Sequence, residues 1–441
     1  MTAAVPRLNL WLLATTVVLL PLLVPRGPGQ SAPVDAVGAA YVVVALAGIY
    51  RSGRPLRLPA GGPLLVILAA SLAATVVGLS LTRSMLSLLA EGYLLLLLVC
   101  VANDLASDRR GLRAILAVWS VAALGWAAVF VGLHFSLLPL WLQGLLPGSA
   151  PEGARAAGAA GNPNLGASYL MTSFFVLAAA PWPRHRPARL AAAGWVLLGL
   201  YATGSNGALL GLAAGLPVLL VAAGLRRTRT PGERLAVVGA ALLGGGLLLG
   251  TLVTATGVPQ VGVSDLRALA SHQRAGVFGE SLGRLDRSVS GRLTTWSHGW
   301  NAAGSGMVVG VGPGAAPEIP LAGSTLRRGL HNDYLAFLIE RGVVGLLGLL
   351  ALAAVLLRWS VRLLDARLPD GDGRWSPAGL GAAVVANLVL ASNHESFHFR
   401  HLWILVGLTW AACQLVTGPR PAPAVGILPD QTAKELAHAG Q

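Results

Sequence analysis

Long apolar runs separated by short polar segments dominate the sequence. A run of about 18 or more residues can span a bilayer. A lone span must satisfy its own backbone hydrogen bonds, so each run predicts a helix. The predicted helices cover residues 8–24, 34–50, 63–82, 84–102, 112–135, 163–180, 187–203, 207–224, 235–256, 333–357, 378–394 and 401–417.

The composition agrees with an all-α integral membrane protein of about twelve transmembrane helices. Hydrophobic residues make up 54% of the chain and charged residues 11%, against about a quarter charged in soluble proteins. The run from Leu8 to Val24 has no clear small-x-small cleavage site, so it predicts a membrane helix rather than a signal peptide. Cys100 and Cys413 lie inside apolar runs and form no disulfide framework.

Arginine positions predict the orientation of the helices in the membrane. Basic residues concentrate in cytoplasmic loops, and the arginines alternate between the loops if both termini are cytoplasmic. The short outer loops then carry only Arg26, Arg83, Arg155 and Arg400. The net charge of +14 accompanies no recognisable nucleic-acid-binding module, so nucleic acid is not an expected partner.

One long loop, residues 257–332, lies outside and divides helices 1–9 (residues 1–256) from helices 10–12 (residues 333–417). Loops of this length are uncommon and usually functional. This one is rich in arginine, which fits either a solvated loop or a phosphate-binding surface, because the guanidinium binds phosphate oxygens bidentately. Residues 418–441 are rich in Pro and Ala and predict a disordered cytoplasmic tail.

The end of this loop contains the strongest candidate for chemistry. His331 lies where the loop enters the tenth helix, and histidine can accept a proton near neutral pH. A histidine at a membrane boundary is, on its own, more often an interfacial residue. If the helix is regular, Gly342 and Gly345 share the face of His331 and would let a neighbouring helix approach closely.

Other polar residues in or near the apolar runs are secondary candidates. Glu91 lies inside the fourth run, and a buried carboxyl group in a membrane is a functional hypothesis by default. His394, His398 and His401 cluster at the outer turn between the last two runs. They could line an acceptor site, but their spacing straddles a turn rather than one helix face, and no metal site is predicted there.

The segment His331-Asn332, nine residues, Gly342, two residues and Gly345 resembles the signature of the O-antigen ligase superfamily. That superfamily includes O-antigen ligases, surface-polysaccharide polymerases and some protein O-oligosaccharyltransferases. The resemblance covers about residues 160–400. Its other parts are Gly291-Arg292-Leu293 with Trp296, the glycine-rich Gly310-Val311-Gly312-Pro313-Gly314, and Asn162-Pro163-Asn164. The chain departs from the family at Ser205-Asn206-Gly207, where Asn206 replaces an expected arginine.

The resemblance implies a bacterial inner-membrane glycosyltransferase with its site on the extracytoplasmic face. An acceptor hydroxyl would attack a glycan carried on polyprenyl diphosphate, with His331 as the base and Arg292 beside the leaving diphosphate. The residues expected to bind the lipid diphosphate or glycan are Arg327, Arg328, Asn332, Asn162 and Asn164. We expect inversion at the anomeric carbon, with no metal or cofactor, and a lipid, glycan or protein as acceptor.

Two alternatives belong to other classes of protein. A lipid-linked glycan flippase or secondary transporter would move the donor without breaking it, but transporters tend to show internal repeats and broken helices with polar groups near mid-membrane. A cell-shape or division glycan polymerase would use a similar donor, but its characteristic motifs are absent. The sequence does not separate ligase from polymerase.

Overall fold

The structure is a computed structural model that describes residues 7–23, 31–139, 141, 156–228, 230–257, 296, 308–316, 330–366 and 376–417. Within these residues it contains twelve α-helices longer than one turn and no β-strand. The helices are α1 (Arg7–Leu19), α2 (Pro33–Arg51), α3 (Gly61–Val77), α4 (Leu81–Leu105), α5 (Arg109–His134), α7 (Pro163–Ala179), α8 (Arg186–Thr203), α9 (Asn206–Leu225), α10 (Pro231–Gly257), α13 (Asp333–Leu364), α14 (Ala378–Leu390) and α15 (Arg400–Thr417).

Each predicted helix corresponds to one of these helices, so the all-helical fold is confirmed. Among the described helices, α2, α4, α5, α9 and α13 are long and apolar enough to cross a membrane, and three apolar helices are shorter. One of these, α14, has 13 residues, which is fewer than the roughly 20 that a hydrocarbon core requires. The structure therefore supports a multi-pass membrane protein, while twelve crossings and the loop topology stay predictions.

Two helices end earlier than the lengths of their apolar runs predict. The first helix ends at Leu19 rather than residue 24, because the ring of Pro21 restricts the residue before it to extended conformations. The helix predicted at 378–394 ends at Leu390. The polar residues that follow form a turn whose backbone is bonded to α13 instead.

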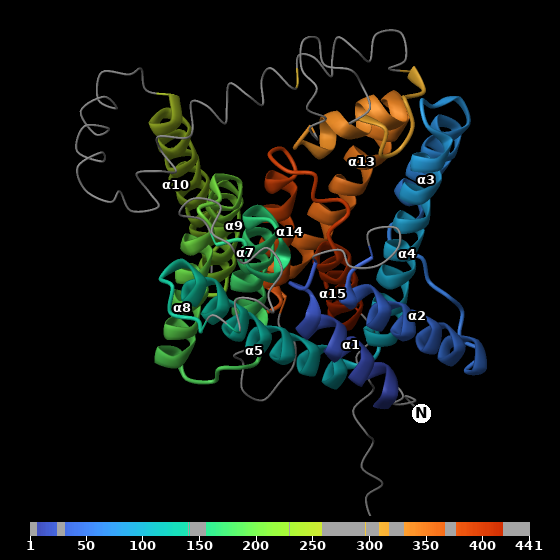
Figure 1. Cartoon of the computed structure of the whole chain (residues 1–441). Helices are drawn as coiled ribbons and strands as arrows, with labels where there is room; N and C mark the ends of the chain where they lie inside the picture. The colour runs from blue at the N-terminus through green and yellow to red at the C-terminus, as the bar shows by residue number, and fades with distance from the viewer. Residues whose placement is uncertain are drawn as a thin grey trace, which may run out of the picture.

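The helices are arranged around α13, α14 and α15, which occupy the middle of the molecule (Figure 1). α14 packs against α9, α7, α13 and α15, so it joins the two sides of the bundle. α7, α8, α9 and α10 lie on one side, and α3 and α4 lie on the other, where α13 packs along α3 (Figure 1). The core is continuous across these helices, with Trp119, Tyr169 and Phe175 among its largest buried side chains.

Most of the predicted loop 257–332 and all of the predicted tail 418–441 lie outside the described residues. Of the loop, the structure describes Trp296, the segment 308–316 and residues 330–332. Gly257 ends α10 and Asp333 begins α13, so the long segment lies between α10 and α13, as predicted.

Candidate functional site

His331 lies immediately before α13, in a backbone conformation that is unusual for its residue type. Its φ angle is 52°, in the left-handed region that costs an L-residue about 1–2 kcal/mol. Glu395 holds it there, because its Oε1 accepts a hydrogen bond of 2.8 Å from the His331 amide. The His331 side chain is exposed. The structure thus presents a histidine at the surface on a backbone fixed by a carboxylate.

Asn332 is the N-cap residue of α13. Its side-chain oxygen accepts a hydrogen bond of 3.0 Å from the amide of Leu335, which is the standard N-cap interaction. The amide oxygen is therefore engaged in capping α13. This capping role accounts for asparagine directly after His331, and the predicted binding role has no described contact to support it.

Asp333 joins the start of α13 to the turn between α14 and α15. Its Oδ2 accepts hydrogen bonds of 2.7 Å from both the amide and the hydroxyl of Ser396, and its Oδ1 accepts one of 3.3 Å from the amide of Phe397. The Asp333 amide donates to the carbonyl of Ala391 at 2.8 Å. Residues 391–399 are thereby bonded to the same backbone that carries His331.

Glu395 and His398 form an ion pair within this turn. Their Oε2 and Nε2 atoms are 3.8 Å apart. Burial alone would raise the pKa of Glu395, but the hydrogen bond and charge of His398, with the amide of His331, bring that pKa below its ordinary value. Partial burial alone would lower the pKa of His398, but Glu395 and Asp333 raise it above its ordinary value. Because the His398 side chain is 50% exposed, water weakens the pair.

The turn between α8 and α9 lies beside His394. The ring of His394 is buried and lies edge-to-face with the ring of His331, with centroids 6.0 Å apart. A Cβ atom on Gly207 would lie 3.4 Å from Cδ2 of His394. The turn that carries Asn206, where the family resemblance predicts an arginine, is therefore adjacent to the histidine cluster.

Trp296 connects the arginine segment of the long loop to His331. Its indole Nε1 donates a hydrogen bond of 2.8 Å to the carbonyl of Leu330, the residue directly before His331. Trp296 follows Arg292 by four residues in the sequence. This contact anchors the end of that segment at the entry to α13, whereas Arg292, Arg327 and Arg328 themselves lie outside the described residues.

Asn162 and Asn164, the two asparagines of the Asn162-Pro163-Asn164 motif, lie at the start of α7. Asn162 is the N-cap of that helix, and its Oδ1 accepts a hydrogen bond of 2.9 Å from the amide of Asn164. Nearby on α7, the hydroxyl of Ser168 lies 2.9 Å from Nε2 of His401, so that histidine is engaged in helix packing.

The tenth helix is not regular, which corrects the expectation for Gly342. Its φ and ψ angles are 66° and −171°, and they kink α13 at this position. That region of backbone space is essentially restricted to glycine. A Cβ atom here would meet the carbonyl of Val308 and lie 2.8 Å from the carbonyl carbon of Val309. A loop segment, rather than a neighbouring helix, approaches this glycine.

That segment, residues 308–316, contains the predicted glycine-rich turn. The kink leaves helix carbonyls without their usual partners, and the segment supplies them: the amide of Val311 donates to Ile339 at 2.9 Å and the amide of Gly312 donates to Glu340 at 3.0 Å. The amide of Leu79 donates to the carbonyl of Val311 at 2.8 Å. The segment is thus bonded to both α13 and the end of α3.

A buried ion cluster lies beside the kink. Arg341 donates to Glu91 and to Glu340, the latter at 3.0 Å. Sequence reasoning singled out Glu91 but missed Arg341, although a charged pair inside an apolar run was a signal for it.

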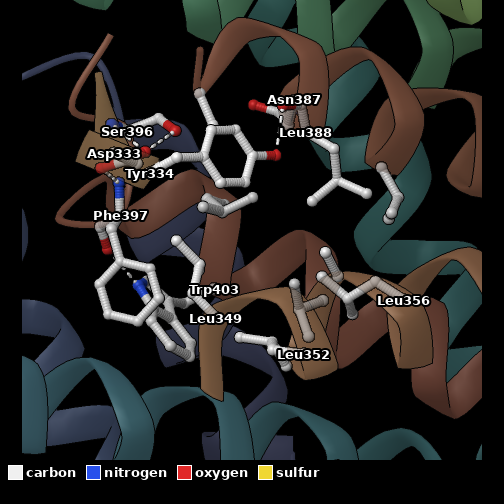
Figure 2. A pocket seen from close by; sticks show the side chains of 15 residues that line it. Asp333, Tyr334, Leu349, Leu352, Leu356, Asn387, Leu388, Ser396, Phe397 and Trp403 are labelled. Carbon is white, nitrogen blue, oxygen red and sulfur yellow. Dashed lines mark hydrogen bonds between the residues drawn. The ribbon is translucent and has the colours of Figure 1, made fainter. Parts of the chain in front are cut away.

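A small cavity lies between α13, α14 and α15, below Asp333. Figure 2 shows Leu349, Leu352 and Leu356 on one side, with Asp333 and Ser396 at another edge. Its volume is about 40 Å³ and its lining is almost entirely apolar. A cavity of this size holds a few waters at most.

Comparison with known proteins points to the same family as the histidine motif. The family model described as O-antigen ligase matches residues 191–350, which include His331, the kink at Gly342 and the ion-cluster residues of α13. Among curated proteins, none matches the chain. The resemblance predicted from the histidine motif is confirmed. The chain is therefore a helical, multi-pass membrane protein whose residues 191–350 match the family model described as O-antigen ligase.

Proposed function

We propose that the protein transfers an oligo- or polysaccharide from a polyprenyl-diphosphate carrier to an acceptor hydroxyl on the extracytoplasmic face of the bacterial inner membrane. The observation that carries this proposal is the exposed His331, whose backbone is fixed by Glu395 and whose neighbour Leu330 is bonded to Trp296. A proton acceptor is thereby presented beside the anchored end of the arginine segment.

In this scheme His331 removes the proton of the acceptor hydroxyl as the oxygen attacks the anomeric carbon. The bond between that carbon and the phosphate oxygen breaks, and the lipid diphosphate leaves with the electron pair. Attack opposite the leaving group inverts the anomeric configuration. General-base catalysis of this kind contributes about 10²–10⁴-fold to the rate.

The leaving diphosphate requires cations near its growing negative charge. Arg292 is the first candidate, and Arg327 and Arg328 precede His331 closely enough in sequence to assist. Guanidinium groups bind phosphate oxygens bidentately, and cations held in place before the reaction stabilise the transition state electrostatically. In this scheme arginine side chains supply the positive charge beside the diphosphate, and no step uses a metal ion.

The test is glycan transfer in proteoliposomes that contain a polyprenyl-diphosphate oligosaccharide, an acceptor and a metal chelator. We expect transferred glycan and free lipid diphosphate to appear together, with an anomeric configuration opposite to that of the donor. Movement of intact donor across the bilayer without release of lipid diphosphate would contradict the proposal and favour the flippase or transporter class.

A further inference from the structure

The ion cluster beside the kink of α13 has no part in the proposed chemistry, yet it joins three helices. Arg341 is 2% exposed. Its Nε donates to the hydroxyl of Ser71 on α3 at 3.0 Å, and its Nη2 donates to Glu91 on α4. Its Nη1 donates to Glu340 at 3.0 Å, and its guanidinium lies 4.2 Å from the ring centroid of Phe337.

A buried cluster of charges destabilises the fold unless each charged group has a well-placed partner. Removing water from a charge costs several kcal/mol, and taking away one partner of a buried pair leaves the other uncompensated. Arginine fits the position because its planar guanidinium directs several donors at fixed angles. Here those donors reach α3, α4 and α13 at once, so the three helices are fixed relative to one another at this point.

The same cluster also bonds to the long loop. Oε1 of Glu340 accepts a hydrogen bond of 3.4 Å from the amide of Ala316, and the carbonyl of Glu340 accepts the amide of Gly312. Residues 333–341 therefore have His331 at one end and the cluster at the other. Any rotation of this short helix about the kink would move both the histidine and segment 308–316.

We propose that Arg341 and Glu91 are positioning residues, which set the orientation of residues 333–341 and thereby hold His331 in register with the long loop. The proposal rests on the proposed function, because the loop carries the arginines assigned to the diphosphate. A displacement of about 1 Å at a reacting group can cost on the order of 10²-fold in rate. Donor binding depends on residues outside the cluster and is not directly altered.

The test compares Glu91→Leu, Glu91→Gln and a matched control, Asp104→Leu. Two carboxylates face Arg341, so Glu91→Leu leaves a charge-balanced pair with Glu340 and removes only the link to α4. Glu91→Gln keeps an acceptor oxygen for Nη2. Asp104 is also a buried carboxylate of α4, but it accepts hydrogen bonds from Asn9 at 3.2 Å and from Tyr41 at 3.0 Å, which lie on α1 and α2.

We expect Glu91→Leu to lower kcat on the order of 10²-fold with an unchanged donor KM, and Glu91→Gln to restore most of that loss. Hydrogen exchange should quicken at the amides of Val311 and Gly312 in Glu91→Leu alone. Asp104→Leu should lower thermal stability and leave kcat unchanged. If Glu91→Leu does not accumulate in membranes, Ser71→Ala removes the acceptor of Nε and should give the same pattern to a smaller degree.

Equal kcat in Glu91→Leu and wild type, or an equal loss in Asp104→Leu, would overturn the proposal. A fall in kcat without faster exchange at Val311 and Gly312 would overturn it as well. These outcomes are distinct from failure of the proposed function, in which the wild type would transfer no glycan at all. The exchange measurement needs no substrate, so it tests the coupling of cluster and loop in either case.

Discussion

At the scale of single residues, Glu395 decides how His331 is presented. The carboxylate is bonded to the His331 amide and paired with His398. A left-handed φ at a non-glycine residue persists only where its surroundings over-determine it, and this hydrogen bond is the described contact that does so. Glu395 therefore acts on the histidine through its backbone and leaves the ring open to solvent.

Removing the Glu395 carboxylate should release the backbone of His331 from its left-handed conformation. We expect Glu395→Ala to lower kcat by roughly 10- to 100-fold, because a misplaced base loses part of its contribution, with donor binding unchanged. Glu395→Gln keeps an oxygen for the amide and should retain most of the activity. Steady-state transfer kinetics with a separate donor-binding assay check this, and equal activity of Glu395→Ala and wild type would remove Glu395 from the account.

The pair of Glu395 and His398 should make stability depend on pH. The raised pKa of His398 means that its contribution is complete below the ordinary histidine pKa and is lost as pH rises through the raised value. The lowered pKa of Glu395 means that its contribution is present above the ordinary glutamate pKa and is lost as pH falls through the lowered value. Both contributions coexist near pH ~5.5.

Thermal unfolding of wild type and His398→Gln at several pH values measures this effect. The two midpoints should differ most near pH ~5.5 and converge at alkaline pH. The corresponding difference in the free energy of unfolding should be small, about 1 kcal/mol or less, because the pair is partly solvated. A difference that grows with rising pH would have the wrong sign for this pairing.

At the scale of elements, the kink of α13 lets one helix contact both the loop segment 308–316 and the helices of the core. Residues before Gly342 are bonded to segment 308–316, while residues after it pack along α3 and α14. Gly310 has a φ angle of 94° and faces the backbone of Glu340 so closely that a Cβ atom would collide with it. Two glycines thus permit the loop and the helix to meet backbone to backbone.

Gly342→Ala should disrupt this junction. The substitution forces a Cβ atom into glycine-only backbone space, which costs about 1–3 kcal/mol, and into the carbonyl of Val308. We expect a lower thermal midpoint and greatly reduced transfer. Gly194→Ala on α8 is the control, because a Cβ atom there meets nothing within 4 Å, and alanine favours a helix. A Gly342→Ala protein as stable and active as the control would contradict the kink.

The helices could be predicted from sequence because apolar run length determines them nearly alone. The kink could not, because Gly342 lies within a run that reads as one helix, and its conformation follows from a loop distant in sequence. Asn332 and Asn162 cap helices, a role that depends on where each helix starts, and the site roles assigned to His331 and to both asparagines stay predictions. The links from Arg341 to α3 and α4 could not be predicted, because Ser71 and Glu91 are distant from it in sequence.

At the scale of the whole molecule, the account requires the His331 end of the bundle to face outward. Basic residues of the predicted inner loops should then be accessible only from the cytoplasm. Cys100 and Cys413 are buried, so a cysteine introduced at an exposed position would be the reactive thiol of the described residues. Arg186 and Leu137, both exposed, lie on opposite sides in the predicted topology.

A membrane-impermeant thiol reagent applied to intact inner-membrane spheroplasts tests this orientation. Leu137→Cys should be labelled directly, whereas Arg186→Cys should be labelled only after the membrane is opened. Labelling of Arg186→Cys in sealed spheroplasts would reverse the topology and move His331 to the cytoplasmic face.

The most direct test of the central claim is the transfer rate of His331→Ala at saturating donor, compared with wild type in the same proteoliposomes. If His331 is the base, the rate should fall on the order of 10²–10⁴-fold, while donor binding and the thermal midpoint stay near those of wild type. Transfer at an unchanged rate in the folded His331→Ala protein would contradict the account and remove the histidine from the chemistry.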